Sequence, residues 1–165
     1  VASEVINMHK YEKVWFLFGT GTLLVFLVVV GISAFYMGNQ PPSCAVTIDP
    51  ARVDQIEPFN APGLKQIGDN EYQLTIVTSA FNFDVGNAEK LVKIPKGATV
   101  HFTVTTKDVV HGFELVGTNV NMMLEPGYIS TYTNTFEKPG EFTLLCNEYC
   151  GTGHHMMAAT IEVTP

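Results

Sequence analysis

The longest hydrophobic run in the chain lies near its N-terminus. Residues 15–37 form a stretch of 23 residues without a charged side chain. As an α-helix, such a stretch spans roughly 35 Å, which is enough to cross a bilayer core of about 30 Å. Aromatic residues stand at both ends, with Trp15 at the start and Tyr36 near the finish, as is typical of the membrane–water interface. The pattern predicts one transmembrane helix within an N-terminal segment of residues 1–40.

A cleaved secretory signal peptide is the alternative interpretation of this run. The apolar region of a signal peptide is about 7–15 residues long, and no small-x-small cleavage site clearly follows the run, so a retained anchor is favoured. Lys10 and Lys13 precede the run, and the next cationic residue is Arg52. Because positive residues favour the cytoplasmic side of a membrane, we expect a cytoplasmic N-terminus and a C-terminal part outside.

Residues 41–70 are rich in proline and glycine, which argues against a long helix there. We interpret this stretch as a connector between the membrane segment and a C-terminal domain. Cys44 lies in it without an evident partner. We interpret Cys44 as a free thiol near the membrane surface, and lipid attachment as an alternative that nothing in the sequence supports.

From Glu71 onward the hydrophobic pattern changes to short runs rich in Val, Ile, Thr and aromatic residues, with turn signals such as Pro139-Gly140 between them. Short strands at regular spacing are typical of a sandwich or barrel, and no stretch with helical periodicity follows residue 40. Residues 71–165 therefore predict an all-β Greek-key sandwich or barrel. The predicted strands are 72–83, 99–105, 112–116, 128–136, 141–146 and 158–163.

Charge is distributed unevenly along the chain. The formal net charge is −7 at pH 7, which argues against a nucleic acid partner because phosphates repel an acidic surface. The charged residues before residue 38 cancel, so the rest of the chain carries the whole excess. An acidic surface attracts a basic partner, although a need for solubility alone would give the same composition.

Soft metal-binding side chains cluster near the C-terminus. Cys146, Cys150, His154 and Met157 follow a C-x3-C-x3-H-x2-M spacing, and thiolate, imidazole and thioether donors favour copper. Two glycines between Cys150 and His154 allow the backbone to bend tightly. The chain contains three cysteines, an odd number that does not suit a disulfide framework. The cluster therefore indicates a metal site.

A second histidine ligand must come from elsewhere in the chain, because a mononuclear electron-transfer copper site uses two histidines, one cysteine and a weak methionine ligand. His111 is the best candidate, since it lies between two predicted strands and distant loops of a Greek-key sandwich meet at one end. His101 lies inside a strand pattern, and His9 precedes the membrane helix. His155 adjoins His154, and the two rings would point in different directions.

The surplus cysteine allows two metal ions in place of one. Two bridging thiolates, two histidines and one methionine can hold two coppers, and a backbone carbonyl between the cysteines could supply one more donor. A closed donor set of this kind suits electron transfer. A Cys146–Cys150 disulfide is one alternative, but it leaves His111, His154 and Met157 without a role. Zinc is another, although methionine is a poor zinc ligand.

The sequence CNEYCGTGHHMM, residues 146–157, resembles the binuclear CuA site of cytochrome c oxidase subunit II, and VHGF around His111 is similar to that family's other copper-binding loop. The resemblance implies a cupredoxin-like fold and two coppers bridged by the two cysteines. The ligands that it implies are His111, Cys146, the backbone carbonyl of Glu148, Cys150, His154 and Met157.

The single membrane span is similar to subunit II of the B-type haem-copper oxidases. In that group a glutamate at the position of Glu12 lies at the cytoplasmic mouth of the proton pathway, so the resemblance implies a role for Glu12 in proton uptake. Without the resemblance, Glu12 is a solvated charge at a helix end. A-type oxidases commonly have a glutamate at the position of Glu148, and its carboxylate helps to hold a magnesium ion at the interface with subunit I. B-type members need not bind this second metal. Phe81 and Phe83 resemble aromatic residues at the family's electron-accepting face, or they belong to the core.

The function that the resemblance implies is electron transfer in a terminal respiratory oxidase. The CuA centre would accept electrons from a c-type cytochrome and pass them to haem in a partner subunit I, which also holds CuB and reduces oxygen to water with proton pumping. The chain would cross the lipid bilayer of a prokaryotic cell membrane, with the CuA domain on the outer, periplasmic side.

Three other functions compete with this one. A membrane-anchored copper carrier outside any oxidase is the alternative that the sequence excludes least. Subunit II of the quinol oxidases resembles this fold but lacks the copper ligands. Nitrous oxide reductases are soluble and carry a large second domain, whereas this chain has an apparent anchor and no room for a further domain in its 165 residues.

Overall fold

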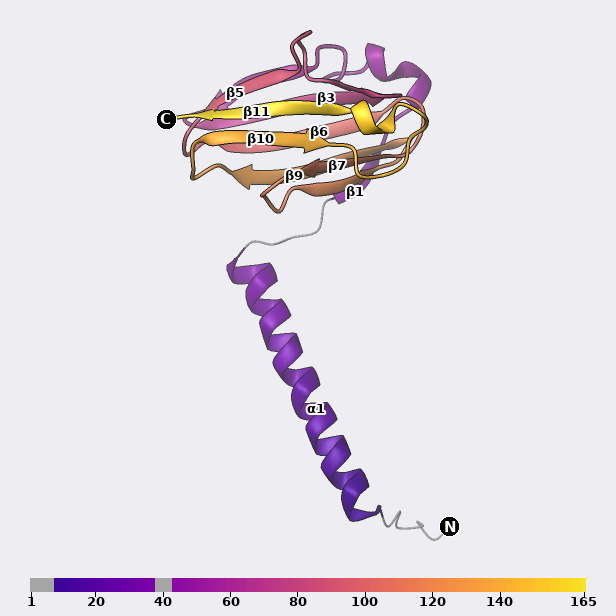
Figure 1. Cartoon of the computed structure of the whole chain (residues 1–165), viewed down its shortest axis with the longest axis vertical. Coiled ribbons are helices and arrows are strands. Elements are labelled where there is room, and N and C mark those ends of the chain that lie inside the picture. Colours follow the sequence, from indigo (N-terminus) through magenta and orange to yellow (C-terminus); the bar gives the residue numbers. More distant parts are fainter. Residues whose placement is uncertain (1–7, 38–42) are drawn as a thin grey trace. The chain divides into compact units, whose positions relative to one another are not determined.

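The computed structural model describes residues 8–37 and 43–165. The chain divides into two compact units, residues 1–40 and residues 41–165, and the colours of Figure 1 follow the chain through them. Among the described residues, the first unit is helical and the second consists mainly of β-strands.

The N-terminal unit is an apolar helix. The α-helix α1 spans Lys10–Gly31 and continues as a π-helical turn, η1, over Ile32–Tyr36. At its start the carboxylate of Glu12 accepts a hydrogen bond of 2.9 Å from the backbone N–H of His9, a capping box that satisfies a free donor at the helix end. None of the helical residues is buried within the chain. By length and composition the helix can cross a membrane, in agreement with the predicted span of residues 15–37.

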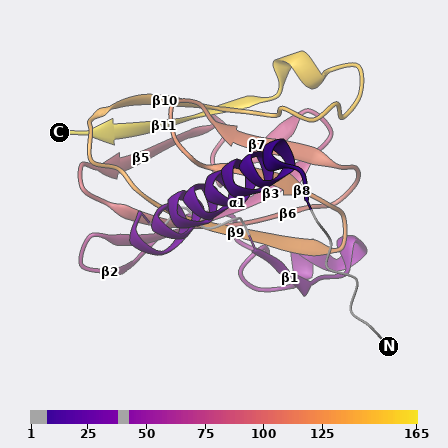
Figure 2. The same cartoon turned by 90° about the horizontal axis from the view of Figure 1, so that it is seen from below.

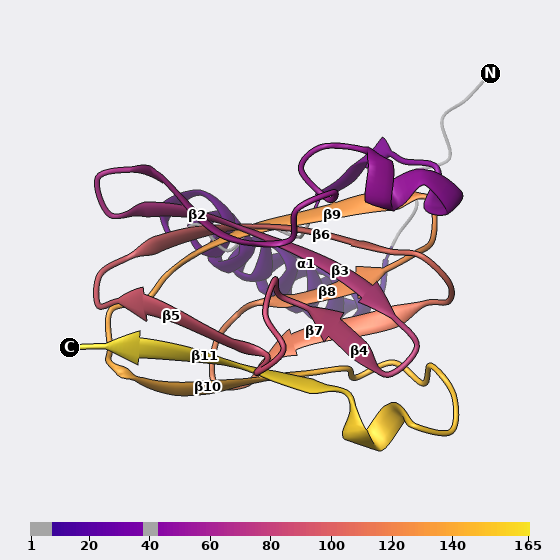
Figure 3. The ribbon, with the colours of Figure 1, turned by 90° about the horizontal axis from the view of Figure 1, so that it is seen from above.

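The C-terminal unit is a sandwich of two β-sheets, which lie face to face in Figure 3. The first sheet has the order β1 (Ser43–Thr47), β9 (Tyr128–Thr135), β6 (Thr99–Thr106), β3 (Glu71–Ser79) and β2 (Gly63–Gly68), and β4 (Asn82–Asp84) also pairs with β3. The second has the order β5 (Leu91–Pro95), β11 (Ala158–Thr164), β10 (Gly140–Leu145), β7 (His111–Leu115) and β8 (Asn121–Leu124). Two 3-10 turns complete it, η2 (Pro50–Gln55) and η3 (His154–Met156).

Strand direction varies within each sheet. β3 runs parallel to β6, and β5 runs parallel to β11, whereas β10 pairs antiparallel with both β11 and β7. The predicted all-β sandwich is confirmed. Its mixed pairing means that strands distant in the sequence become neighbours, which is what brings separate loops together at the ends of the sandwich.

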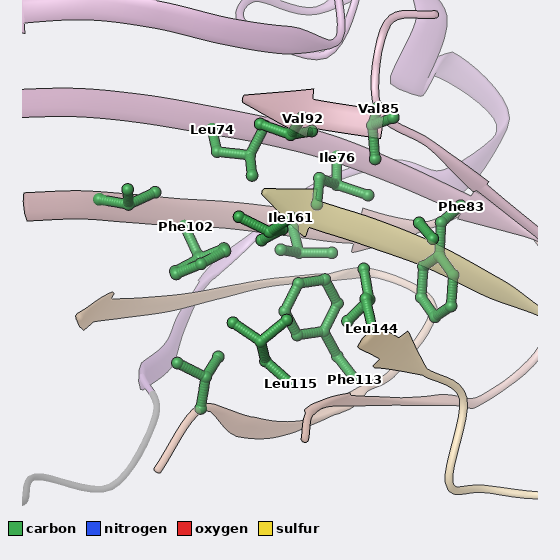
Figure 4. Close-up of a cluster of buried hydrophobic side chains, with 14 of the residues drawn as sticks. Leu74, Ile76, Phe83, Val85, Val92, Phe102, Phe113, Leu115, Leu144 and Ile161 are labelled. Carbon is green, nitrogen blue, oxygen red and sulfur yellow. The ribbon is translucent and has the colours of Figure 1, made fainter. Parts of the chain in front are cut away.

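Buried hydrophobic side chains fill the space between the two sheets. Along β6, Val100, Phe102 and Val104 are buried and alternate with more exposed residues, which is the two-residue period of a strand. Phe113 packs edge-on against Phe102 and Phe83, with ring centroids 5.7 and 5.9 Å apart, and Figure 4 shows its ring among these side chains. This core fixes the strands from which the candidate site is built.

The predicted connector over residues 41–70 differs from the structure. β1 and β2 lie within this range and form the two outer strands of the first sheet. Val53 and Phe59 from the same range are buried with Val77 of β3 in a second hydrophobic cluster. The prolines and glycines of this range separate short strands and turns of the domain and do not indicate a linker. β2 is an edge strand and carries exposed polar residues such as Lys65. Its sequence therefore lacks the alternation of hydrophobic and polar residues by which a strand is predicted.

Some residues of the predicted boundary cannot be compared with the structure. Residues 1–7 and 38–42 lie outside the described residues. Cys44 belongs to β1, but its side chain also lies outside what the structure describes. The interpretation of Cys44 as a free thiol therefore stays a prediction.

The predicted strand over residues 72–83 is two strands. β3 ends at Ser79 and β4 begins at Asn82, and the two strands pair as a hairpin. Between them Phe81 has a φ of 66°, a left-handed conformation that is uncommon outside glycine. Neither glycine nor proline marked this turn in the sequence. β5 and β8 are further strands that the pattern did not predict, because each contributes only two buried positions.

We predict that residues 41–165 fold without the helix and that residues 71–165 do not. The shorter fragment lacks β1, β2 and the buried Val53 and Phe59. Full burial of one such side chain is worth about 1.5–3 kcal/mol, against a typical domain stability of about 5–15 kcal/mol. Urea unfolding followed by circular dichroism should give a cooperative transition for the longer fragment alone. Equal transition midpoints would contradict the structural role of residues 41–70.

Candidate metal centre

Two loops at one end of the sandwich carry the predicted metal ligands. One is the segment of residues 146–157 between β10 and β11, and the other leads into β7 at His111. In Figure 1 and Figure 2 the first of these loops lies at the end of the sandwich away from the C-terminus. β7 and β10 are antiparallel neighbours, with Leu145 opposite Glu114. This register brings His111 alongside the residues that follow Cys146.

Gly112 allows these two segments to approach closely. A Cβ atom at Gly112 would lie 1.8 Å from the side-chain oxygen of Asn147 and 2.7 Å from the backbone nitrogens of Asn147 and Glu148. Any larger residue would therefore displace the loop that carries both cysteines. The close packing accounts for a glycine directly after His111.

The two cysteine sulfurs form the middle of the donor cluster. Cys146 Sγ and Cys150 Sγ are 3.8 Å apart. His111 Nδ1 lies 3.9 Å from Cys146 Sγ, and His154 Nδ1 lies 3.6 Å from Cys150 Sγ. One histidine from each loop thus approaches the sulfur pair with the same ring nitrogen.

The two weaker donors complete this arrangement. The thioether sulfur of Met157 lies 3.8 Å from Cys150 Sγ, and the backbone carbonyl oxygen of Glu148 lies 3.2 Å from Cys146 Sγ. The side chain of Glu148 itself is exposed. The structure therefore brings together all six groups that the sequence singled out, each within 4 Å of one of the two sulfurs.

The donor groups are shielded from water to different degrees. His111 is fully buried, and Met157 and Cys146 are also buried. Cys150 and His154 are half-buried. The cluster is thus shielded from solvent at His111, Cys146 and Met157 and more accessible at Cys150 and His154.

Asp108 orients the ring of His111. Its Oδ1 lies 2.9 Å from His111 Nε2, so an Nε2–H that donates to the carboxylate leaves the Nδ1 lone pair facing Cys146. Burial raises the pKa of Asp108, but hydrogen bonds from His111 and from the backbone N–H groups of Val109 and Ala80 outweigh it, and the net pKa is lowered. Sequence reasoning missed this residue, although its position three residues before His111 was the available signal.

The cysteines are held as a pair of thiols. Both are free in the structure, and their 3.8 Å separation exceeds the ~2.05 Å length of a disulfide bond. Burial raises the pKa of the Cys150 thiol, with further increases from the hydrogen bond and charge of Cys146, while backbone hydrogen bonding from Phe81 opposes the rise. Because metals bind thiolates, a metal that binds here must displace protons.

The chemistry of the donor set fits copper. The donor atoms of His111, Cys146 and Cys150 lie within 4.8 Å of one another, and the further imidazole, thioether and carbonyl surround them. Thiolate, imidazole and thioether are ligands that suit copper. A closed zinc site takes four nitrogen or sulfur ligands from histidine and cysteine and would leave the buried thioether of Met157 unused.

The other candidate residues lie outside this cluster. His101 is on β6, where its Nδ1 lies 2.9 Å from the hydroxyl of Thr133. Glu12 is part of the capping box of α1. Phe83 is fully buried in the core, so of its two interpretations the structure favours the core. Phe81 is half-buried, and its ring lies against the loop of residues 146–157.

Comparison with known proteins agrees with this geometry. Residues 71–164 match the family model for the periplasmic domain of cytochrome c oxidase subunit II. A cytochrome c oxidase subunit 2 of Thermus thermophilus is 36% identical over 170 residues, covering 96% of this chain and 99% of that protein. A second protein of that name and species is 40% identical over 118 residues, covering 70% of this chain and 84% of that protein.

The fold is also similar to a solved structure. A chain from the cryo-EM structure of a heme-copper terminal oxidase dimer superposes with a TM-score of 0.82 at 34% identity, covering 94% of this chain and 100% of that chain. The 36% identical protein matches 96% of this chain, so that match includes residues of the helical unit as well as the β-sandwich. This chain belongs to the cytochrome c oxidase subunit II family.

Proposed function

We propose that this chain is the electron-accepting subunit of a terminal respiratory oxidase, and that its six donor groups hold a binuclear CuA centre. Electrons would arrive from a c-type cytochrome and leave for haem in subunit I, where haem and CuB reduce oxygen to water with proton pumping. The observation that carries the proposal is the single network of donors around two sulfurs 3.8 Å apart. Membership of the subunit II family supports it.

The protein contributes donor groups whose positions are already fixed by the fold. A copper pair held by the two cysteines and the four other donor groups would supply a one-electron redox centre. His111 is oriented by Asp108, and Met157 is buried in the hydrophobic core, so both side chains are held in place by their neighbours. Protein groups that are already placed need little reorganisation when charge changes, which favours rapid electron transfer.

The N-terminal helix would anchor the domain in a prokaryotic cell membrane. Its length and composition suit a bilayer, and Lys10 and Lys13 at its start favour a cytoplasmic N-terminus. The copper domain would then lie on the outer, periplasmic side. At the cytoplasmic end Glu12 stays our candidate for proton uptake, where its carboxylate caps the helix.

The acidic charge of the chain supports the proposal that the electron donor is a basic protein. The whole excess of −7 falls after residue 37, so a positively charged face on a c-type cytochrome would be attracted to the domain. Such attraction raises association rates and weakens with added salt.

A copper carrier outside any oxidase would share the anchor and the donor set, so isolation of the complex is the decisive experiment. We predict that the full chain, extracted from its own membrane in mild detergent, co-purifies with a haem-bearing subunit. The complex should oxidise reduced cytochrome c at a rate that falls with ionic strength. A copper-loaded chain that is isolated without haem in every detergent would favour the carrier.

Metal analysis and EPR test the copper assignment directly. We predict two coppers per chain, a purple colour and an EPR signal of one electron shared over two coppers. Cys150→Ser should abolish the shared signal because one of the two thiolates is lost, whereas Met157→Leu should keep both coppers and shift the reduction potential, since a weak thioether donor tunes it. One zinc per chain, or a normal spectrum in Cys150→Ser, would contradict the assignment.

Gly112→Ala should damage the copper site without removing a ligand. The added Cβ would collide with the backbone of Asn147 and Glu148, so the cysteine loop must move away from His111. We expect copper to be lost to a chelator at least about tenfold faster, because loss of a group that orients metal ligands typically weakens metal binding by that factor or more. Gly68→Ala is the matched control, because a Cβ there meets only the side chain of Glu71 at 3.4 Å or more. Equal copper retention in both variants would contradict the role of Gly112.

A further inference from the structure

The turn between β3 and β4 contains no ligand, yet it contacts both loops that do. Its two residues are Ala80 and Phe81, which lie between the end of β3 at Ser79 and the start of β4 at Asn82. Neither residue has a donor side chain. Ala80 nevertheless donates a hydrogen bond to Asp108 in the loop before His111, and the ring of Phe81 packs on the cysteine loop.

The first contact leads to His111 through Asp108. The backbone N–H of Ala80 donates to Asp108 Oδ2 at 2.5 Å, and Oδ1 of the same carboxylate lies 2.9 Å from His111 Nε2. A backbone hydrogen bond of 3.1 Å from Lys107 to Thr78 ties the same loop to β3. The turn therefore holds the carboxylate that orients His111.

The second contact leads to the cysteine loop. The ring of Phe81 lies directly over Gly153 and Gly151, where a Cβ atom would come within 2.6 Å and 3.2 Å of ring carbons. These glycines adjoin His154 and Cys150 in the sequence. A ring packed this closely restricts how far the backbone between the two ligands can move.

The backbone of Phe81 indicates that this arrangement is enforced by its surroundings. Its φ of 66° lies in a region that a side-chain-bearing residue seldom adopts and that persists only where neighbouring contacts hold it. The ring of Phe81 and its unusual backbone conformation thus belong to one fixed arrangement against the cysteine loop.

We propose that the Ala80–Phe81 turn is a shared positioning element, which sets His111 relative to Cys150 and His154 by bracing both ligand loops at once. A change that loosens the contact of the turn with the cysteine loop should therefore also loosen the loop that leads to His111, because the two contacts come from adjacent residues. The inference rests on the proposed copper site.

The first test compares Phe81 with a phenylalanine of the hydrophobic core in the full-length, copper-loaded chain. Phe81→Leu removes the ring over the glycines and should speed copper loss to a chelator about tenfold and change the copper hyperfine splitting in EPR. Phe136→Leu should lower the thermal midpoint, since Phe136 is buried in the core against Phe102 and Phe142, but leave the EPR spectrum unchanged. Equal effects of the two variants on the copper signal would overturn the proposal, because a general loss of packing would then suffice.

The second test measures coupling between the two contacts. Asp108→Asn weakens the acceptor shared by Ala80 and His111, and it is combined with Phe81→Leu in a double-mutant cycle. If one turn braces both loops, the fold-change in copper loss for the double variant should differ from the product of the single fold-changes by more than about twofold. Fold-changes that multiply would show that the loops are held independently and would overturn the proposal.

A metal-free measurement separates this inference from the copper assignment. In the apo chain, Phe81→Leu should increase amide hydrogen exchange in residues 151–156 and around His111, whereas Phe136→Leu should leave the exchange rates of both segments unchanged. A wild-type chain that binds no copper pair would overturn the proposed function. A wild-type copper pair with unaltered exchange in Phe81→Leu would overturn the brace alone.

Discussion

The candidate metal centre depends on the close approach of β7 to the loop that follows β10. The two backbones meet at Gly112, where the space for a Cβ atom is filled by Asn147 and Glu148. On one side of Gly112 is His111, and on the other is Phe113, which is fully buried between the sheets. The hydrophobic core thus fixes β7, and β7 in turn fixes how near an imidazole can come to a sulfur 35 positions away in the chain.

Electrostatics adds a second constraint at the same place. The pKa of Asp108 is lowered, so its carboxylate is ionised at neutral pH beside a fully buried imidazole. A negative charge on the far side of the ring makes its free nitrogen a stronger donor. It also favours the more positive, oxidised form of a metal pair bound through His111. The sulfurs and the carboxylate therefore lie on opposite sides of one ring.

The grouping of the donor side chains in residues 146–157 could be predicted from the sequence because it follows local spacing, as in the step from Cys150 to His154. The approach of His111 to this group could be predicted because two strand patterns flank it. Asp108 and Phe81 could not be assigned, since what they do depends on contacts between segments that only the sheets bring together, such as the bond from Ala80 across 28 positions. The connector was misjudged for a related reason. Val53 is apolar in a stretch of turn residues, and only its burial against β3 shows that it belongs to the domain.

The segment His154-His155-Met156-Met157 contains two pairs of identical residues, which affects how relatives of this chain are aligned. Within each pair one side chain faces the sulfurs and the other faces solvent, as Met157 is buried while Met156 is 68% exposed. The short turn η3 after Gly153 decides which is which. An alignment shifted by one residue here would match histidine to histidine and methionine to methionine on paper, while exchanging surface residues for donors. Only the three-dimensional path of the turn tells the two alignments apart.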